Sequence, residues 1–210
     1  MGLLVKICGV TTPAQADACA ALGADMIGLN FVPGSPRAID PRAGARIAEA
    51  VRGRAEVVGV VADLAEPDLR RLREEAQLDR LQLHGDELPE LVAALAPLAY
   101  KALRVGSAED LAGVERYPGL LLVDARVAGK LGGTGASVDA ALVAPLAERR
   151  AVILAGGLTP ANVAARIRAI RPAGVDVAGG VERSPGDKDL DLVAAFIREA
   201  RRAPLSACEP

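Results

Sequence analysis

The chain has 210 residues, of which 51% are apolar and 25% charged, and its formal net charge is −2. This length and composition are typical of one soluble globular domain that buries a sizeable core. The balanced charge offers no basic surface for nucleic acid or an anionic membrane, and no apolar run reaches the roughly 18 residues of a membrane span. The first residues also lack a secretory pattern. We therefore expect a cytoplasmic protein without nucleic-acid or membrane partners.

The scarce reactive and aromatic residues narrow the function further. Three cysteines, at positions 8, 19 and 208, are too few and too scattered for a disulfide framework or a paired-cysteine metal site. His84 is the single histidine, which excludes a multi-histidine metal site within one chain. Only four aromatic residues occur, so no stacking platform for nucleic-acid bases is available.

Short apolar runs alternate with longer segments of helical spacing along the whole chain. The runs predict strands at 3–8, 26–31, 57–62, 80–84, 100–105, 119–124, 151–155 and 174–178. The intervening segments predict helices at 13–22, 41–52, 66–77, 87–96, 108–116, 139–148, 160–171 and 189–202. Several helices begin with a proline at a start position, as in Thr12-Pro13 and Asp40-Pro41.

This alternation indicates βαβ units with parallel strands. Eight such units fit an α/β fold of the closed (β/α)8 TIM-barrel type at the compact end of its size range. An open doubly wound sheet is the competing fold, but the GxGxxG typical of its first turn is missing here. We predict a single barrel domain over residues 1–203 and a loose C-terminal tail at 204–210.

Polar residues gather on one face of four predicted strands. Strand side chains alternate between the lumen of a barrel and its surrounding helices. In each of these strands the alternate residues that share one face are purely aliphatic, as are Val5 and Ile7. The residues of the other face include Lys6, Cys8, Gln82, His84, Asp124 and Asp176, mostly where the strands end. Since active sites of this fold lie at the carboxyl ends of the strands, we predict a site there. A buried structural network, such as Lys6 paired with Asp176, is the alternative.

Glycine-rich turns follow the last three predicted strands. Gly156-Gly157 and Gly179-Gly180 follow the seventh and eighth strands, and Gly133 and Gly135 belong to a third stretch after the sixth. Glycines there let backbone N–H groups approach an anion. One such pair is ordinary turn chemistry, but their joint position predicts a phosphate-binding site.

Motifs from Lys6 to about Arg201 resemble the N-(5′-phosphoribosyl)anthranilate isomerases of tryptophan biosynthesis. They are KICG at 6–9, SPR at 35–37, QLHGD at 82–86, KA at 101–102, LVDA at 122–125, GGTG at 132–135, AGGL at 155–158, GVE at 180–182 and SPG at 184–186. The resemblance implies a barrel enzyme that needs no cofactor and no metal. It converts an aminoaldose, N-(5-phosphoribosyl)anthranilate, to the aminoketose 1-(2-carboxyphenylamino)-1-deoxyribulose 5-phosphate by an Amadori rearrangement.

The resemblance also implies roles for two residues. Asp124 is the general acid that protonates the furanose ring oxygen, and Cys8 is the general base that removes the C2′ proton. An acid working at neutral pH needs a raised pKa, which partial burial of Asp124 supplies. A thiol base needs a lowered pKa, and Lys6, about 7 Å away on the same strand face, is the cation expected to lower it.

The remaining implied contacts concern the substrate, a small phosphorylated molecule. Arg37 matches the arginine that holds the anthranilate carboxylate, a role suited to its planar fork. Gln82 and His84 match positions near the site, and Asp176 is expected to contact the substrate amine or hydroxyls. Members of the family occur as monomers and homodimers, and we expect one of these states.

Some positions depart from the family pattern. Ala178-Gly179 stands where many members have two serines before GVE, which removes hydroxyl donors but keeps the backbone N–H groups. Ala136 stands where a lysine is frequent. These changes affect details of the phosphate and lid contacts rather than the reaction.

The residues alone allow two other classes of function: another enzyme among the phosphate-binding barrels, such as an aldolase or an epimerase, and a barrel without enzymatic activity. An aldolase of the Schiff-base type needs a lumen lysine, for which Lys6 and Lys101 are available. A metal-dependent epimerase needs more histidines than the chain has. A barrel that only binds a phosphorylated metabolite would leave the pairing of Cys8 with Asp124 unexplained.

Overall fold

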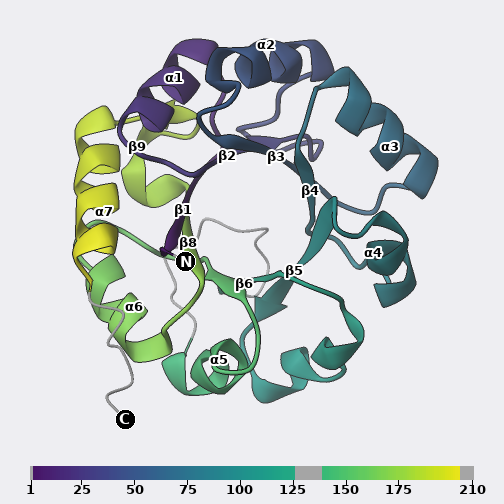
Figure 1. Ribbon diagram of the computed structural model, residues 1–210, viewed down its shortest axis with the longest axis vertical. Coiled ribbons are helices and arrows are strands. Elements are labelled where there is room, and N and C mark those ends of the chain that lie inside the picture. Colours follow the sequence, from purple (N-terminus) through teal and green to yellow (C-terminus); the bar gives the residue numbers. More distant parts are fainter. Residues whose placement is uncertain (1, 126–138, 204–210) are drawn as a thin grey trace.

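The computed structural model of the protein describes residues 2–125 and 139–203. Eight parallel strands close into a barrel in chain order, and β8 returns to pair with β1. Helices surround this ring of strands (Figure 1). The predicted α/β barrel is therefore confirmed. The predicted tail at 204–210 and the glycines at 133 and 135 lie outside the described residues.

The strands and helices follow the predicted order. The strands are β1 Leu4–Cys8, β2 Met26–Asn30, β3 Glu56–Val61, β4 Arg80–Leu83, β5 Ala99–Val105, β6 Leu121–Ala125, β7 Val152–Leu154 and β8 Gly174–Val177. The α-helices are α1 Pro13–Ala21, α2 Pro41–Val51, α3 Glu66–Glu75, α4 Pro89–Leu95, α5 Ala140–Ala147, α6 Val163–Ile170 and α7 Leu190–Arg202. In the described residues no helix is long and apolar enough to cross a membrane.

Local chemistry explains where the first helices begin. Thr12 and Asp40 precede α1 and α2, and their side chains accept hydrogen bonds from the backbone N–H groups of Gln15 and Ala43. Proline occupies the first helical turn in both helices, where its missing N–H costs nothing. The two helix starts predicted from these residue pairs are confirmed.

Two connections differ from the prediction. The helix expected at 108–116 is instead two 3-10 turns, η1 (Ala108–Leu111) and η2 (Val114–Arg116). Gly113 stands between them with a φ of 74°, a left-handed conformation that interrupts a helix. After β8 the chain forms the short turn η3 (Gly179–Val181) and a hairpin of β9 (Glu182–Ser184) and β10 (Asp187–Lys188), which the sequence reading missed.

The apolar residues form two clusters that match the predicted strand parity. Val5, Ile7, Leu81 and Leu83 belong to the large cluster that includes the helices. A smaller cluster consists of strand residues and their immediate neighbours and fills the lumen; it contains Met26, Val58, Tyr100, Ala102, Leu122, Ile153 and Ala155. The polar residues of the lumen lie next to this apolar cluster, toward the carboxyl ends of the strands.

A buried ion pair fixes the loop that follows β4. Lys101 is 3% exposed and donates hydrogen bonds to the carbonyls of Leu83 (3.1 Å) and Gly85 (2.6 Å) and to the carboxylate of Glu87 (2.9 Å). Glu87 in turn accepts from the backbone N–H groups of Asp63 and Gly85. Lys101 alternates with Tyr100 and Ala102, which face the lumen, so it points toward the helices. Its expected lumen position was therefore wrong.

We predict that Lys101→Met destabilises the protein by about 3–5 kcal/mol, because it leaves the Glu87 charge buried without its cation. The double variant Lys101→Met/Glu87→Gln removes both charges and should lose less than Lys101→Met alone. Urea unfolding of the parent, both single variants and the double variant measures this coupling. Additive losses in the double variant would contradict it.

Candidate active site

The lumen of the barrel contains a fully buried cation. Lys6 on β1 has no exposed surface, and its Nζ lies 3.0 Å from Asp176 Oδ1 and 2.8 Å from Gln82 Oε1. Strand register places Lys6 beside Asp176 on β8. Burial alone would lower the pKa of Lys6, but Asp176, Cys8 and Tyr100 together outweigh it and the pKa is raised. The structural pair that the sequence allowed as an alternative is present.

This environment argues against Schiff-base chemistry. A lysine nucleophile needs a neutral amine and therefore a lowered pKa, whereas the pKa of Lys6 is raised. Lys101 points away from the lumen and is held by Glu87 and two carbonyls. Neither lysine that the sequence offered to an aldolase is suited to that role.

A chain of polar contacts leads from Lys6 to Asp124. Gln82 Oε1 also accepts a hydrogen bond from the hydroxyl of Tyr100 at 3.1 Å. Gln82 Nε2 lies 3.1 Å from His84 Nδ1, and His84 Nε2 lies 3.6 Å from Asp124 Oδ2. The structure thus brings Lys6, Asp176, Gln82, His84 and Asp124 together. Tyr100 is a member that the sequence reading missed, although it stands one residue before the quoted Lys101-Ala102 motif.

The residues in this series of polar contacts differ in their solvent exposure. Asp124 is buried but retains 8% exposure, and the His84 side chain retains 21%. Gln82 is only 1% exposed, and the contacts described above engage both ends of its amide. Gln82 is therefore almost closed off from solvent, and its amide joins Lys6 to His84.

His84 is neutral at physiological pH. Burial lowers its pKa to about 4, and the positive charges of Lys101, Lys6 and Arg104 lower it in the same direction. An imidazolium at this position would face three cations. In the neutral His84 side chain, one ring nitrogen is a hydrogen-bond donor and the other is an acceptor.

Cys8 ends β1 beside Gly28 on β2. A Cβ atom at position 28 would lie 2.8 Å from Cys8 Sγ and 3.1 Å from Lys6 Cε, too close for either contact. Only glycine leaves room for both side chains. The sequence signal for this residue was a glycine inside an apolar strand, which marks close approach of another group.

The pKa of Cys8 differs from the expectation. Burial raises it, and the positive charge of Lys6 offsets that effect only in part. Asp176 also raises the thiol pKa while it neutralises Lys6. The expected lowering toward neutrality is therefore wrong for the free protein, because burial outweighs the effect of Lys6 and the charge of Lys6 is shared with Asp176.

Arg37, from the loop after β2, is held over the end of β1. Its Nε lies 2.9 Å from Glu182 Oε1 and its Nη2 lies 2.6 Å from Oε2, a bidentate pair. Gly9 has a φ of 77°, and a Cβ there would lie 2.3 Å from Arg37 Cδ. The arginine stem thus covers Gly9 directly after Cys8, with 18% of its side chain exposed.

The hairpin of β9 and β10 anchors this arginine. Lys188 is 1% exposed, and its Nζ donates to Glu182 Oε1 (2.7 Å) and to the carbonyls of Cys8 and Ala178. Burial alone raises the pKa of Glu182, but hydrogen bonds from Arg37 and Lys188 outweigh it and hold the pKa below its usual value. Glu182 and Lys188 were not predicted as site residues, although Glu182 ends the quoted GVE motif.

The glycine turns after β7 and β8 pack against each other. Gly156 and Gly157 have φ values of 86° and 62°, which favour glycine. A Cβ at Gly180 would lie 1.9 Å from the Leu158 carbonyl oxygen, so no side chain fits there. Gly179 and Gly180 begin η3, and the first N–H groups of a helix have no acceptor within it. Four of the six predicted phosphate-site glycines are thereby adjacent.

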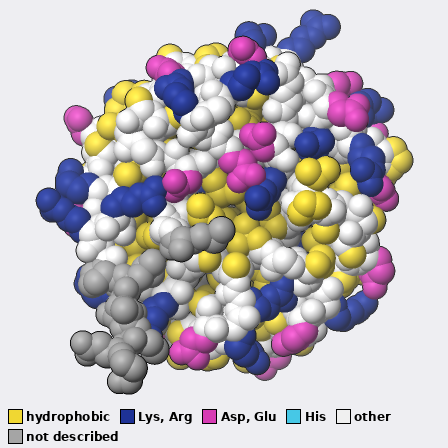
Figure 2. Space-filling view, viewed as in Figure 1, with side chains coloured by type: hydrophobic (Ala, Val, Ile, Leu, Met, Phe, Trp, Pro, Cys, Tyr) yellow, Lys and Arg dark blue, Asp and Glu magenta, His cyan; other side chains and the backbone are white. Residues whose placement is uncertain are grey.

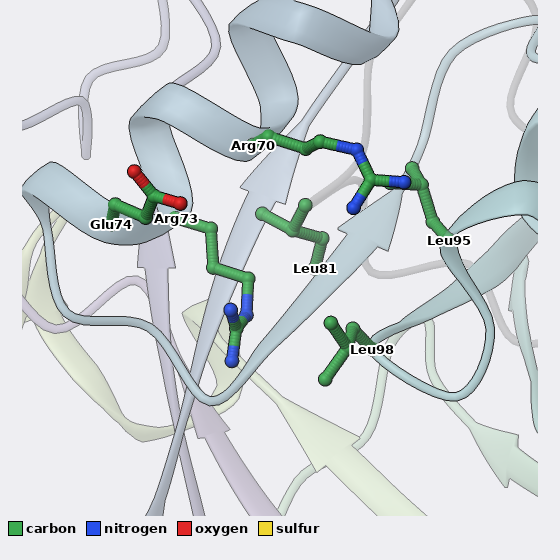
Figure 3. A pocket seen from close by; sticks show the side chains of 6 residues that line it. All are labelled: Arg70, Arg73, Glu74, Leu81, Leu95 and Leu98. Atoms are coloured by element: carbon green, nitrogen blue, oxygen red, sulfur yellow. The ribbon is translucent and has the colours of Figure 1, made fainter.

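One hollow of the structure lies outside the barrel lumen. A hollow between α3 and α4 is lined by Arg70, Arg73, Glu74, Leu81, Leu95 and Leu98 (Figure 3). Leu81 faces the helices, so this hollow lies on the opposite side of β4 from Gln82. Acidic and basic side chains are interspersed over the molecular face seen in Figure 2. Across residues 2–125 and 139–203, no group of three His, Cys, Asp or Glu side chains is arranged to hold a metal ion.

The fold and these residues define a (β/α)8-barrel protein with titratable groups and glycine turns at one mouth. The sequence matches the family described as N-(5′-phosphoribosyl)anthranilate (PRA) isomerase over residues 5–199. The chain belongs to this family.

Individual relatives cover nearly the whole chain. The N-(5′-phosphoribosyl)anthranilate isomerase of Magnetococcus marinus is 42% identical over 97% of both chains. The same enzyme of a Roseiflexus species is 46% identical over 95% of this chain and 98% of its own. The crystal structure of phosphoribosyl anthranilate isomerase from Thermotoga maritima superposes with a TM-score of 0.87 and 34% identity, covering 95% of this chain and 98% of that one.

We predict that Cys8 reacts slowly with iodoacetamide at neutral pH and faster as pH rises, with a midpoint above the roughly 8.5 of an ordinary thiol. Burial raises the pKa, so the reactive thiolate appears only at higher pH. Mass spectrometry of a Cys208→Ser variant between about pH 7 and pH 10 follows this reaction. Cys19 is fully buried and serves as the internal control. A midpoint below that of a free thiol would overturn the prediction.

Proposed function

We propose that this chain converts N-(5-phosphoribosyl)anthranilate to 1-(2-carboxyphenylamino)-1-deoxyribulose 5-phosphate in tryptophan biosynthesis. Family membership and relatives that align over almost their full length support the reaction. The observation that carries the proposal is the placement of Cys8 and Asp124 at the carboxyl ends of β1 and β6 in one lumen, joined through Lys6, Gln82 and His84.

Asp124 acts first as general acid in this scheme. Its carboxyl proton passes to the furanose ring oxygen while the bond between C1′ and that oxygen breaks. The anthranilate nitrogen supplies the electron pair that forms the C1′=N bond of a Schiff base. Asp124 retains 8% exposure at the end of β6, which supports a role in direct contact with the substrate.

Cys8 then acts as general base. Its thiolate takes the C2′ proton, the C–H electrons form a C1′=C2′ bond, and the C=N π electrons return to nitrogen. The resulting enolamine tautomerises to the aminoketone as the C2′ hydroxyl loses its proton and C1′ gains one. The adjacent Lys6 charge favours the thiolate, while burial opposes it.

The remaining groups bind the two ends of the substrate. Glu182 occupies one edge of the Arg37 guanidinium and leaves the other edge for the anthranilate carboxylate. The N–H groups of Gly156, Gly157, Gly179 and Gly180 receive the phosphate. Gly133 and Gly135 complete this site in our proposal.

The substrate contact of Asp176 and the oligomeric state remain predictions, and both belong to this proposal. The Asp176 side chain retains 10% exposure, and we propose that it contacts the substrate amine or hydroxyls beside its ion pair with Lys6. A further solved relative from Thermotoga maritima is described as a dimeric isomerase from which monomers were generated. We propose a monomer or homodimer for this chain, in the cytoplasm, with no nucleic-acid partner.

Turnover of substrate generated in situ tests the reaction and the acid–base pair together. Loss of anthranilate fluorescence reports it, and the chain has no tryptophan to interfere. We expect Cys8→Ser and Asp124→Asn each to lower kcat by about 100-fold or more, the range of lost acid–base catalysis. Both variants should still bind reduced 1-(o-carboxyphenylamino)-1-deoxyribulose 5-phosphate, the ligand present in another solved relative. A folded but inactive parent protein would overturn the proposed reaction.

Arg37→Lys should raise KM by about 10- to 100-fold, because a compact ammonium replaces the planar fork that meets a carboxylate. Steady-state kinetics measure the change. Arg42→Lys, at an exposed position of α2, is the matched control and should leave KM unchanged. An unchanged KM in Arg37→Lys would assign the anthranilate carboxylate to another group.

A further inference from the structure

The amide of Gln82 has only one orientation compatible with its surroundings. The ammonium of Lys6 can donate hydrogen bonds but cannot accept one, so the Gln82 atom 2.8 Å away from it must be the oxygen. The Tyr100 hydroxyl donates to this same oxygen. A flipped amide would place its NH2 group against the fully buried ammonium group of Lys6. The Gln82 nitrogen must therefore face His84.

This orientation selects one tautomer of His84. The Gln82 NH2 group is a donor, so His84 Nδ1, 3.1 Å away, must be the acceptor and carries no proton. A neutral imidazole then carries its proton on Nε2. The neighbouring positive charges of Lys6, Lys101 and Arg104 disfavour a second proton.

The proton on His84 Nε2 points toward Asp124. The distance to Asp124 Oδ2 is 3.6 Å, slightly longer than a hydrogen bond, as is common for catalytic contacts before substrate binds. A carboxyl group that receives this N–H on Oδ2 keeps its own acidic proton on Oδ1. In the proposed reaction, this proton is the one that passes to the ring oxygen of the substrate.

We infer that His84 is a positioning residue for the general acid, and that Lys6 and Tyr100 impose its Nε2–H tautomer through Gln82. This inference rests on the proposed function for the role of Asp124, but the tautomer itself does not. The His84 N–H directs the acidic proton toward the substrate and stabilises the carboxylate that remains after transfer. The first test reads the tautomer and needs no enzymatic activity.

Nitrogen NMR of 15N-histidine-labelled protein gives an unambiguous answer, because the chain contains a single histidine. We expect a pyridine-type signal for Nδ1 and a pyrrole-type signal for Nε2 at neutral pH. Gln82→Glu keeps an acceptor for Lys6 and Tyr100 but puts an acceptor opposite Nδ1, so it should move the proton to Nδ1. Gln77→Glu, on the surface, should leave both signals unchanged. A parent protein with the proton on Nδ1, or an unaltered tautomer in Gln82→Glu, would overturn the inference.

A pair of His84 variants then separates positioning from stability. In His84→Gln the side-chain amide reaches the place of Nε2 and can donate to Asp124, whereas in His84→Asn it reaches only the place of Nδ1. We expect His84→Asn to lose about 10- to 100-fold in kcat, the effect of one hydrogen bond to a charged group, and His84→Gln to recover most of it. KM should change little in either variant.

Each outcome of the kinetics has a distinct meaning. Equal losses of kcat in the two variants, both folded by urea titration, would reduce His84 to a structural role and overturn the inference. A loss confined to KM would make His84 a substrate contact, which also overturns it. If the parent protein has no turnover at all, the proposed function fails, while the NMR experiment still decides the tautomer.

Discussion

The organisation of the barrel mouth depends on one buried ammonium group. Lys6 has no contact with solvent, and a cation in that position is tolerated only with a counter-charge and further acceptors. Asp176 supplies the charge and Gln82 the additional oxygen. Together they tie β1 to β8 and β4 across the lumen. Because the ammonium cannot accept a hydrogen bond, it also sets the direction of the contacts that follow toward His84 and Asp124.

A buried lysine that is bound by one carboxylate and by further oxygen acceptors occurs at two other places in the fold. The chain has four lysines, and Lys6, Lys101 and Lys188 are each 3% exposed or less. Lys101 and Lys188 both bind one glutamate and two backbone carbonyls. A compact ammonium with three rotatable donors suits such a shell, whereas a planar guanidinium would not. These two lysines join the loops after β4 and β8 to the barrel and so position His84 and Arg37.

The sequence was sufficient to predict which strand residues face the lumen, because this depends on the alternation of side chains along a strand. It was insufficient for properties, such as the pKa of Cys8, that depend on residues distant along the chain. Alternation placed Cys8, Gln82, His84, Asp124 and Asp176 in one lumen, because aliphatic residues occupied the opposite parity without exception. Lys101 was expected in the lumen without support from alternation, because its strand has a charged residue on each face, Lys101 and Arg104. The direction of the Cys8 pKa shift was also missed, since it depends on how deeply the thiol is buried and on Asp176 sharing the charge of Lys6. The hairpin that carries Lys188 was missed because its strands are only three and two residues long.

The arrangement also resolves a conflict between the two proposed catalytic groups. A base at Cys8 benefits from positive charge, whereas an acid at Asp124 would lose its proton too early beside a cation. The cations of the mouth are neutralised or directed away: Lys6 by Asp176, Lys101 by Glu87, and Arg37 by Glu182. Burial and the charges of Lys101, Lys6 and Arg104 lower the pKa of His84 to about 4, so the imidazole 3.6 Å from Asp124 is neutral. A neutral N–H orients a carboxyl group without forcing it to ionise. The positive charge of Lys6 that favours the thiolate therefore also helps burial to keep His84 neutral.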